Sequence, residues 1–80
     1  MEKKKNPTFI WILFYTHKYG HDITVYKTKK RAHAVAIDIV RDYRDDFHIN
    51  YEITNTEALS DWYVLTDGLE NIEIIKSILT

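Results

Sequence analysis

The sequence predicts an α+β domain of two layers, in which an antiparallel sheet of three or four strands packs against one long and one short helix. Three observations predict it. An unbroken apolar run, a turn signal and an alternating segment together indicate a β-hairpin. The next segment has the apolar spacing of an amphipathic helix. The chain then ends in an isoleucine-rich segment typical of a strand. The expected order is β-β-α-(β)-α-β, in which the bracketed strand is an open alternative.

Length and composition limit the size and class of the protein. Its 80 residues, of which 45% are hydrophobic, suffice for one globular domain. This length is near the lower limit at which a hydrophobic core alone, without disulfides or a structural metal, holds a fold. We expect a flexible basic arm over residues 1–7 and a single α+β domain over residues 8–80. The chain has no cysteine, which excludes disulfides and suits a cytoplasmic location. No apolar run approaches the roughly 20 residues of a membrane span, so we expect no membrane partner.

The first strand is expected from about Thr8 to Thr16, and the second from about His21 to Thr28. A two-residue turn at Tyr19 and Gly20 would force Tyr19 to a positive φ, which is unfavourable. We therefore predict a three-residue loop over residues 18–20.

This loop sets a register in which Leu13 lies opposite Val25. The core face of the hairpin would then carry Phe9, Trp11, Leu13, Tyr15, Ile23 and Val25. The outer face would carry Ile10, Ile12, Phe14, Thr24 and Tyr26.

A long helix follows, with Thr28 as its N-cap. Its apolar residues repeat at helical spacing along one stripe, which we expect to cover the core face of the hairpin: Ala32, Val35, Ala36, Ile39, Val40, Tyr43 and Phe47. Residues 47–54 alternate between apolar and polar, and the sequence leaves a short strand and a loop both open.

A capping box from Thr54 to Glu57 predicts a second helix over about residues 55–66, which ends before Asp67 and Gly68. Its expected inward residues are Ala58, Leu59, Trp62, Tyr63 and Val64 or Leu65. Residues 69–79 are ambiguous between helix and strand, but the even spacing of their isoleucines favours a strand that pairs beside the first. The first strand would then be central.

The outer face of the sheet is the most informative candidate site. The second helix is one way to cover it. Without such a cover, the apolar patch would mark an interface with a larger protein or with a second copy in a homodimer. Its residues would be Ile10, Ile12, Phe14 and Tyr26, with Ile75 and Leu79 of the last strand.

Charge is divided along the chain. The net charge is −1, but residues 1–31 carry +6 and residues 32–80 carry −7. One side of the long helix, the acidic helix side, carries Asp38, Asp42 and Asp45. Arg41 is placed to offset part of the repulsion on Asp38 and Asp45. This side is either a solvated surface or a docking site for a basic partner. A basic cluster near Trp11 consists of Lys27, Lys29, Lys30 and Arg31. This combination of cations and an aromatic ring makes nucleic-acid binding the alternative function.

The sequence predicts no catalytic site, no metal site, no cofactor and no small-molecule substrate. It has no glycine-rich phosphate loop, nucleophile elbow or zinc-binding helix. The hairpin tip carries His17 and His21, which lie opposite each other in the expected register and are the only basis for a metal or enzyme alternative. Asp22 is expected to point to the opposite face. We expect the protein not to be an enzyme.

Residues 14–43 combine an aromatic strand, a turn with histidine and glycine, an aspartate-led second strand and an alanine-rich helix. This pattern, carried by His17, Gly20, Asp22 and Ala32, resembles small bacterial and phage proteins without an assigned function, so it implies no activity. In size and character the chain is similar to anti-CRISPR proteins. The leading interpretation is a non-catalytic protein-interaction module, in its most concrete form a phage or mobile-element inhibitor that docks sterically onto a bacterial defence complex.

Overall fold

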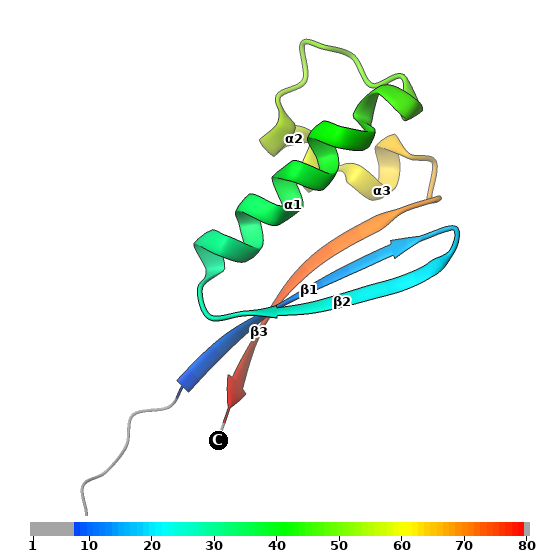
Figure 1. Ribbon diagram of the computed structural model, residues 1–80. Helices are drawn as coiled ribbons and strands as arrows, with labels where there is room; N and C mark the ends of the chain where they lie inside the picture. Colours follow the sequence, from blue (N-terminus) through cyan, green and yellow to red (C-terminus); the bar gives the residue numbers. More distant parts are fainter. Residues whose placement is uncertain (1–7, 80) are drawn as a thin grey trace, which may run out of the picture.

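A computed structural model describes residues 8–79 and shows one antiparallel sheet with its helices packed on one side (Figure 1). The α+β prediction is confirmed, with three strands. The predicted arm over residues 1–7 lies outside the described residues. The elements in chain order are β1 (Thr8–His17), β2 (Gly20–Tyr26), α1 (Lys29–Tyr43), a 3-10 turn η1 (Arg44–Phe47), α2 (Asn55–Ser60), α3 (Trp62–Leu65) and β3 (Asn71–Leu79).

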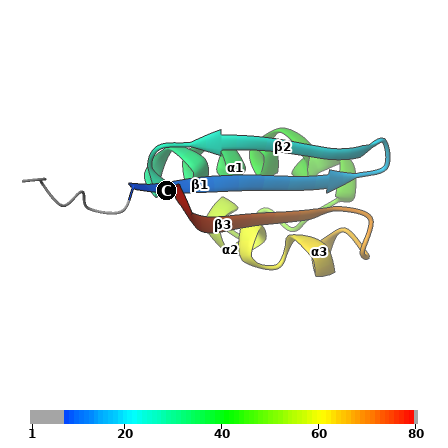
Figure 2. The same ribbon diagram turned by 90° about the horizontal axis from the view of Figure 1, so that it is seen from below.

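The sheet has the order β2-β1-β3, so β1 is central as predicted (Figure 2). Residues 71–79 form a strand, and β3 pairs antiparallel with β1 from Thr8 opposite Leu79 to Thr16 opposite Asn71. The segment left open between strand and loop forms the end of η1 and an irregular connection to α2.

The hairpin loop has two residues, Lys18 and Tyr19, and the predicted three-residue loop is wrong. Among residues 8–79, the only non-glycine residues with a positive φ are His48 and Asp67, so neither loop residue has one. Gly20 instead adopts a φ of 126° directly after the loop. The backbone conformation that disfavoured a short turn therefore falls on a glycine, which adopts it without a steric cost.

The shorter loop shifts the register by one residue, which turns β2 over. Leu13 now lies opposite Thr24, and Ile12 lies opposite Val25. Two predictions for β2 are therefore wrong. Ile23 and Val25 lie on the outer face, and Thr24 and Tyr26 lie on the helix side. The predicted faces of β1 are correct, because Leu13 and Tyr15 are buried beneath the helices.

Helix α1 packs on the sheet through small residues. Ala32, Ala36 and Val40 are fully buried, and alanine side chains let the helix axis approach the strands closely. Thr28 caps the helix as predicted, since its hydroxyl accepts a hydrogen bond of 3.2 Å from the backbone N–H of Arg31. The core cluster at the C-terminal end of α1 consists of Val40, Ile49, Ala58 and Trp62.

The predicted second helix is two short helices, α2 and α3, separated by Asp61. The capping box at Thr54 is present as predicted. Asp61 has φ −111° and ψ 18°, which is outside helical geometry, and the chain changes direction there. Trp62 is buried as predicted, whereas Tyr63, also expected to face inward, is 58% exposed. Of the two alternatives at the end of this segment, Leu65 packs against the core and Val64 is 71% exposed.

Arg44 fixes the irregular segment between η1 and α2. Its guanidinium donates three hydrogen bonds of 2.7 Å, to Asn55 Oδ1 and to the backbone carbonyls of Asn50 and Ile53. These bonds satisfy carbonyls that no regular element pairs. One side chain therefore holds the loop that carries the buried Ile49.

Replacing Arg44 by methionine should lower the free energy of unfolding by about 2 kcal/mol, because the Ile53 carbonyl and Asn55 Oδ1 lose their donor. Urea denaturation followed by circular dichroism measures this loss. Arg41→Met is the matched control, since Arg41 makes only exposed ion pairs and its loss should change stability by less than about 0.5 kcal/mol. Equal effects of the two substitutions would contradict the assigned role of Arg44.

Candidate interaction surfaces

The outer face of the sheet carries a continuous apolar patch, which we call the open face. Viewed from below, the sheet lies in front of every helix, so none of them covers this face (Figure 2). Ile23, Val25 and Ile75 are 62%, 55% and 44% exposed. The three residues from β1 are partly buried between their strand neighbours. By register the open face consists of Ile10, Ile12, Phe14, Ile23, Val25 and Ile75.

Few charges border the open face. The other described side chains that share it by register are polar, and Glu73 is the carboxylate among them: Thr8, Thr16, His21, Asn71, Glu73 and Ser77. Phe14 packs against the ring of His21, with their centroids 5.1 Å apart. Leu79 falls on this side by register, but its side chain lies outside the described residues. Tyr26, predicted for this surface, lies instead on the helix side.

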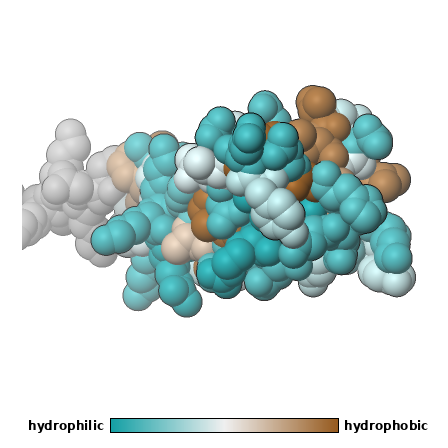
Figure 3. All heavy atoms as spheres, turned by 90° about the horizontal axis from the view of Figure 1, so that it is seen from above, coloured by the Kyte–Doolittle hydropathy of each residue, from teal (hydrophilic) through white to brown (hydrophobic). Residues whose placement is uncertain are grey.

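The acidic helix side faces a groove between α1 and β2. Asp38 and Asp42 line this groove together with Tyr26. Arg41 pairs with Asp38 at 3.1 Å and with Asp42 at 3.6 Å, so its predicted pairing with Asp45 is wrong. Asp45 belongs to the 3-10 turn and is exposed. The predicted stripe therefore spans the end of α1 and the start of η1. Hydrophilic side chains dominate the view of the helix side (Figure 3).

The basic cluster lies where β2 gives way to α1. Lys27, Lys29, Lys30 and Arg31 are all exposed. The ammonium of Lys29 stands 5.9 Å from the ring centroid of Trp11.

Lys76 on β3 adds a further cation beside the basic cluster. Its ammonium stands 4.1 Å from the ring centroid of Phe9 and 5.4 Å from that of Trp11. No pattern in the sequence marks Lys76 as part of this cluster, because only the pairing of β3 with β1 brings it there.

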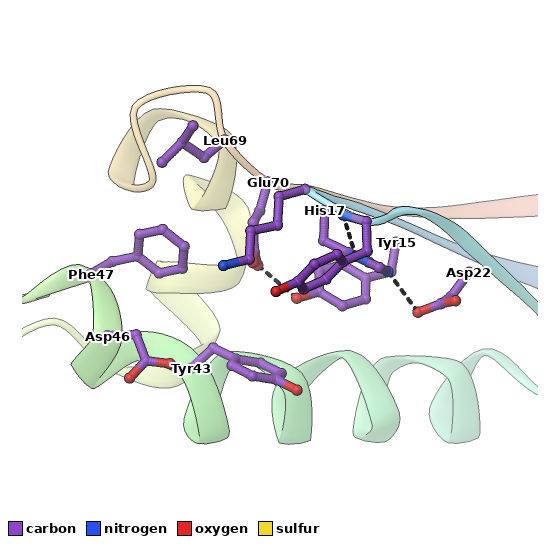
Figure 4. Close-up of a pocket in the computed structure, with 10 residues that line it drawn as sticks. Tyr15, His17, Asp22, Tyr43, Asp46, Phe47, Leu69 and Glu70 are labelled. Atoms are coloured by element: carbon purple, nitrogen blue, oxygen red, sulfur yellow. Dashed lines mark hydrogen bonds and ion pairs between the residues drawn. The ribbon is translucent and has the colours of Figure 1, made fainter.

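A cleft of about 640 Å³ opens between the hairpin tip, the end of α1 and the segment before β3. Figure 4 shows Tyr15 and His17 from the sheet, and Tyr43 and Asp46 from the end of α1 and from η1. Glu70 comes from the segment before β3. The lining residues are Tyr15, His17, Lys18, Tyr19, Asp22, Tyr43, Asp46, Phe47, Leu69 and Glu70. The cleft thus combines aromatic walls with carboxylates.

Glu70 is held at the cleft by two donors. Its Oε1 accepts a hydrogen bond of 2.7 Å from the Tyr15 hydroxyl and one of 3.0 Å from Trp62 Nε1. The buried Thr66 positions the backbone here, since its hydroxyl accepts from the N–H of Glu70 at 3.1 Å and donates to the carbonyl of Trp62 at 2.8 Å. Burial, followed by the hydrogen bond to Glu70 and its negative charge, raises the pKa of Tyr15 well above its usual value of 10.0.

His17 and Asp22 form a pair across the hairpin, with His17 Nε2 and Asp22 Oδ2 2.9 Å apart. The prediction that Asp22 points away from His17 is wrong, and the register explains why. In the two-residue loop, Asp22 lies on the same face as Tyr15 and His17. His21 lies on the opposite face, so the two histidines do not converge. Across residues 8–79, no group of three histidine or acidic side chains is arranged to hold a metal ion.

Comparisons with protein-family models, with curated proteins and with solved structures gave no match. Within the described part of the chain, no helix has the length and apolar character needed to cross a bilayer. The functional interpretation therefore depends on the surfaces described above.

The raised pKa of Tyr15 predicts how stability depends on alkaline pH. In the unfolded chain this phenol ionises near pH 10.0, whereas the fold keeps it protonated to higher pH. Its contribution to stability should be complete below that pH and decline as pH rises further. We expect the stability difference between the wild-type protein and Tyr15→Phe to shrink from pH 8 to pH 11, as measured by urea denaturation. A difference that stays constant over this range would contradict the raised pKa.

Proposed function

We propose that this protein is a non-catalytic interaction module that docks its open face onto a larger cytoplasmic protein and acts by steric obstruction. A phage or mobile-element inhibitor of a bacterial defence complex is the most concrete form of this function. The observation that carries the proposal is the exposure of Ile23, Val25 and Ile75, on the two strands that flank β1, on a sheet face that no described helix covers. Contiguous exposed apolar patches of this kind are typical of protein–protein contacts.

The size of the open face favours a larger partner over a second copy. Three strands spaced about 4.8 Å apart, with a length of about 30 Å, present roughly 400 Å² of flat area. A stable interface buries about 800 Å² on each partner. A flat second copy stacked on the open face would fall short of this area. A concave partner that also contacts the exposed edges of β2 and β3 can reach it.

Two substitutions test the open face. Ile23→Lys combined with Val25→Lys places charges in the apolar patch at exposed positions, so the fold should persist. Val64→Lys is the matched control, because Val64 is equally exposed but lies on α3, within the helical layer. In a bacterial strain with an active CRISPR defence, the wild-type chain and the control should restore plaque formation by a targeted phage, and the double variant should not. Circular dichroism checks that all three are folded.

Two outcomes would count against this proposal. Equal rescue by the double variant would show that the open face does not bind the partner. Absence of rescue in every strain with an active defence would show that the protein is not an inhibitor of these systems. Sedimentation of the purified protein separates the partner classes. We expect a monomer at about 50 μM, a concentration at which a specific homodimer would be populated. A dimer dispersed by the double variant would assign the open face to self-association.

Nucleic-acid binding is the second candidate, and one observation favours it. Lys29 and Lys76 flank Trp11, and single-stranded nucleic acids bind to surfaces that combine cations with aromatic rings. If this function holds, a labelled single-stranded DNA should bind with an affinity that falls steeply between about 50 and 200 mM salt. Replacing Lys29, Lys30 and Arg31 by glutamine should reduce both the affinity and its salt dependence. Failure to bind at the lower salt concentration would exclude the candidate.

A further inference from the structure

We propose that the cleft beside the hairpin tip binds the guanidinium group of an arginine side chain presented by a partner protein. This site lies on the helix side and is separate from the open face. It therefore stands or falls independently of the proposed function. The proposal follows from the aromatic walls, the carboxylates and an acceptor oxygen that the fold leaves without a donor.

Aromatic rings form the walls of the cleft. Tyr15 stands at the back and is only 9% exposed, and its ring centroid lies 6.5 Å from that of Tyr43 across the cleft. Phe47 and Tyr19 extend the lining on either side. Guanidinium groups stack on aromatic faces and are weakly hydrated, so they enter such a site at a lower desolvation cost than an ammonium group.

The charge of the cleft matches a cation. Its lining holds three carboxylates, from Asp22, Asp46 and Glu70, against one ammonium, from Lys18, and Asp22 is already paired with His17. The Lys18 ammonium stands 4.9 Å from the ring centroid of Tyr19, which shows that a cation already makes an aromatic contact at this site. Lys18 is therefore an internal competitor for a guanidinium ligand.

Glu70 supplies the anchoring acceptor. Both hydrogen bonds from Tyr15 and Trp62 reach Oε1, and within the part of the chain that the structure covers no hydrogen bond is made to Oε2. A carboxylate fixed by two donors and retaining a vacant oxygen is preorganised for a charge-assisted hydrogen bond. Figure 4 shows Glu70 directed toward Tyr15 at the cleft.

The experiment uses the full chain and the peptide acetyl-Gly-Arg-Gly-amide as the probe, titrated by two-dimensional NMR. Chemical shifts should move for residues around Tyr15, Tyr43 and Glu70. The same peptide with citrulline in place of arginine is the matched ligand control, because citrulline keeps the shape and loses the charge. It should bind at least about tenfold more weakly.

Two protein variants should act in opposite directions. Glu70→Gln keeps an acceptor for Tyr15 and Trp62 but removes the charge, and should weaken arginine binding about tenfold. Lys18→Gln removes the competing ammonium and should tighten binding. Glu52→Gln is the control, since Glu52 is exposed on the loop before α2 and should leave the affinity unchanged.

Three results would overturn the proposal. These are equal binding of the citrulline peptide, chemical shifts that map to the open face alone, and absence of shifts at about 10 mM arginine peptide. If Glu70→Gln disturbs the near-ultraviolet circular dichroism signal of Trp62, Asp46→Asn replaces it as the test variant. This substitution should also weaken binding of the arginine peptide. Asp46 is exposed and its side chain makes no hydrogen bond within residues 8–79, so removing its charge does not alter the core.

Discussion

The structure depends on one constraint, which is that the helices cover a single side of the sheet. Because β1 lies between two other strands, its backbone is paired on both edges, and only one of its two faces is packed against α1. Leu13 and Tyr15 enter the core from that face. The residues that alternate with them, such as Ile12 and Phe14, are excluded from it by the pleat of the strand. An apolar strand in a chain of this size therefore produces a core and an exposed patch at once.

The same layering sorts charge toward the two ends of the molecule. Because α1 begins beside the end of β2 and runs back along the hairpin, its basic first turn lies at one end and Asp46 lies near the hairpin tip at the other (Figure 1). Lys76 joins the basic end through strand pairing, and Glu70 joins the acidic end through its bonds to Tyr15 and Trp62. The small domain thus presents three chemically distinct surfaces in three directions.

Local patterns in the sequence predicted most of the fold. The stripe from Ala32 to Val40, the cap at Thr28 and the alternation along β1 are short-range signals with direct physical causes. The orientation of β2 was predicted wrongly, because the φ penalty was assigned to Tyr19, whereas Gly20 bears it after a shorter loop. Glu70 could not be predicted as part of a site. Its partner Tyr15 is 55 residues away, and no local pattern marks such a contact.

The pairing of β1 with β3 joins the two ends of the described chain, since Thr8 lies opposite Leu79. This contact closes nearly the whole chain into a loop, and pairing of such high sequence separation forms late and slowly. During synthesis the hairpin and α1 emerge before β3, and one edge of β1 stays without a partner until residues 71–79 are made. A nascent chain in that state exposes both an apolar strand edge and an apolar face. Rapid synthesis of the segment between β1 and β3, or a chaperone that shields this edge, would then govern how much of the protein reaches its folded form.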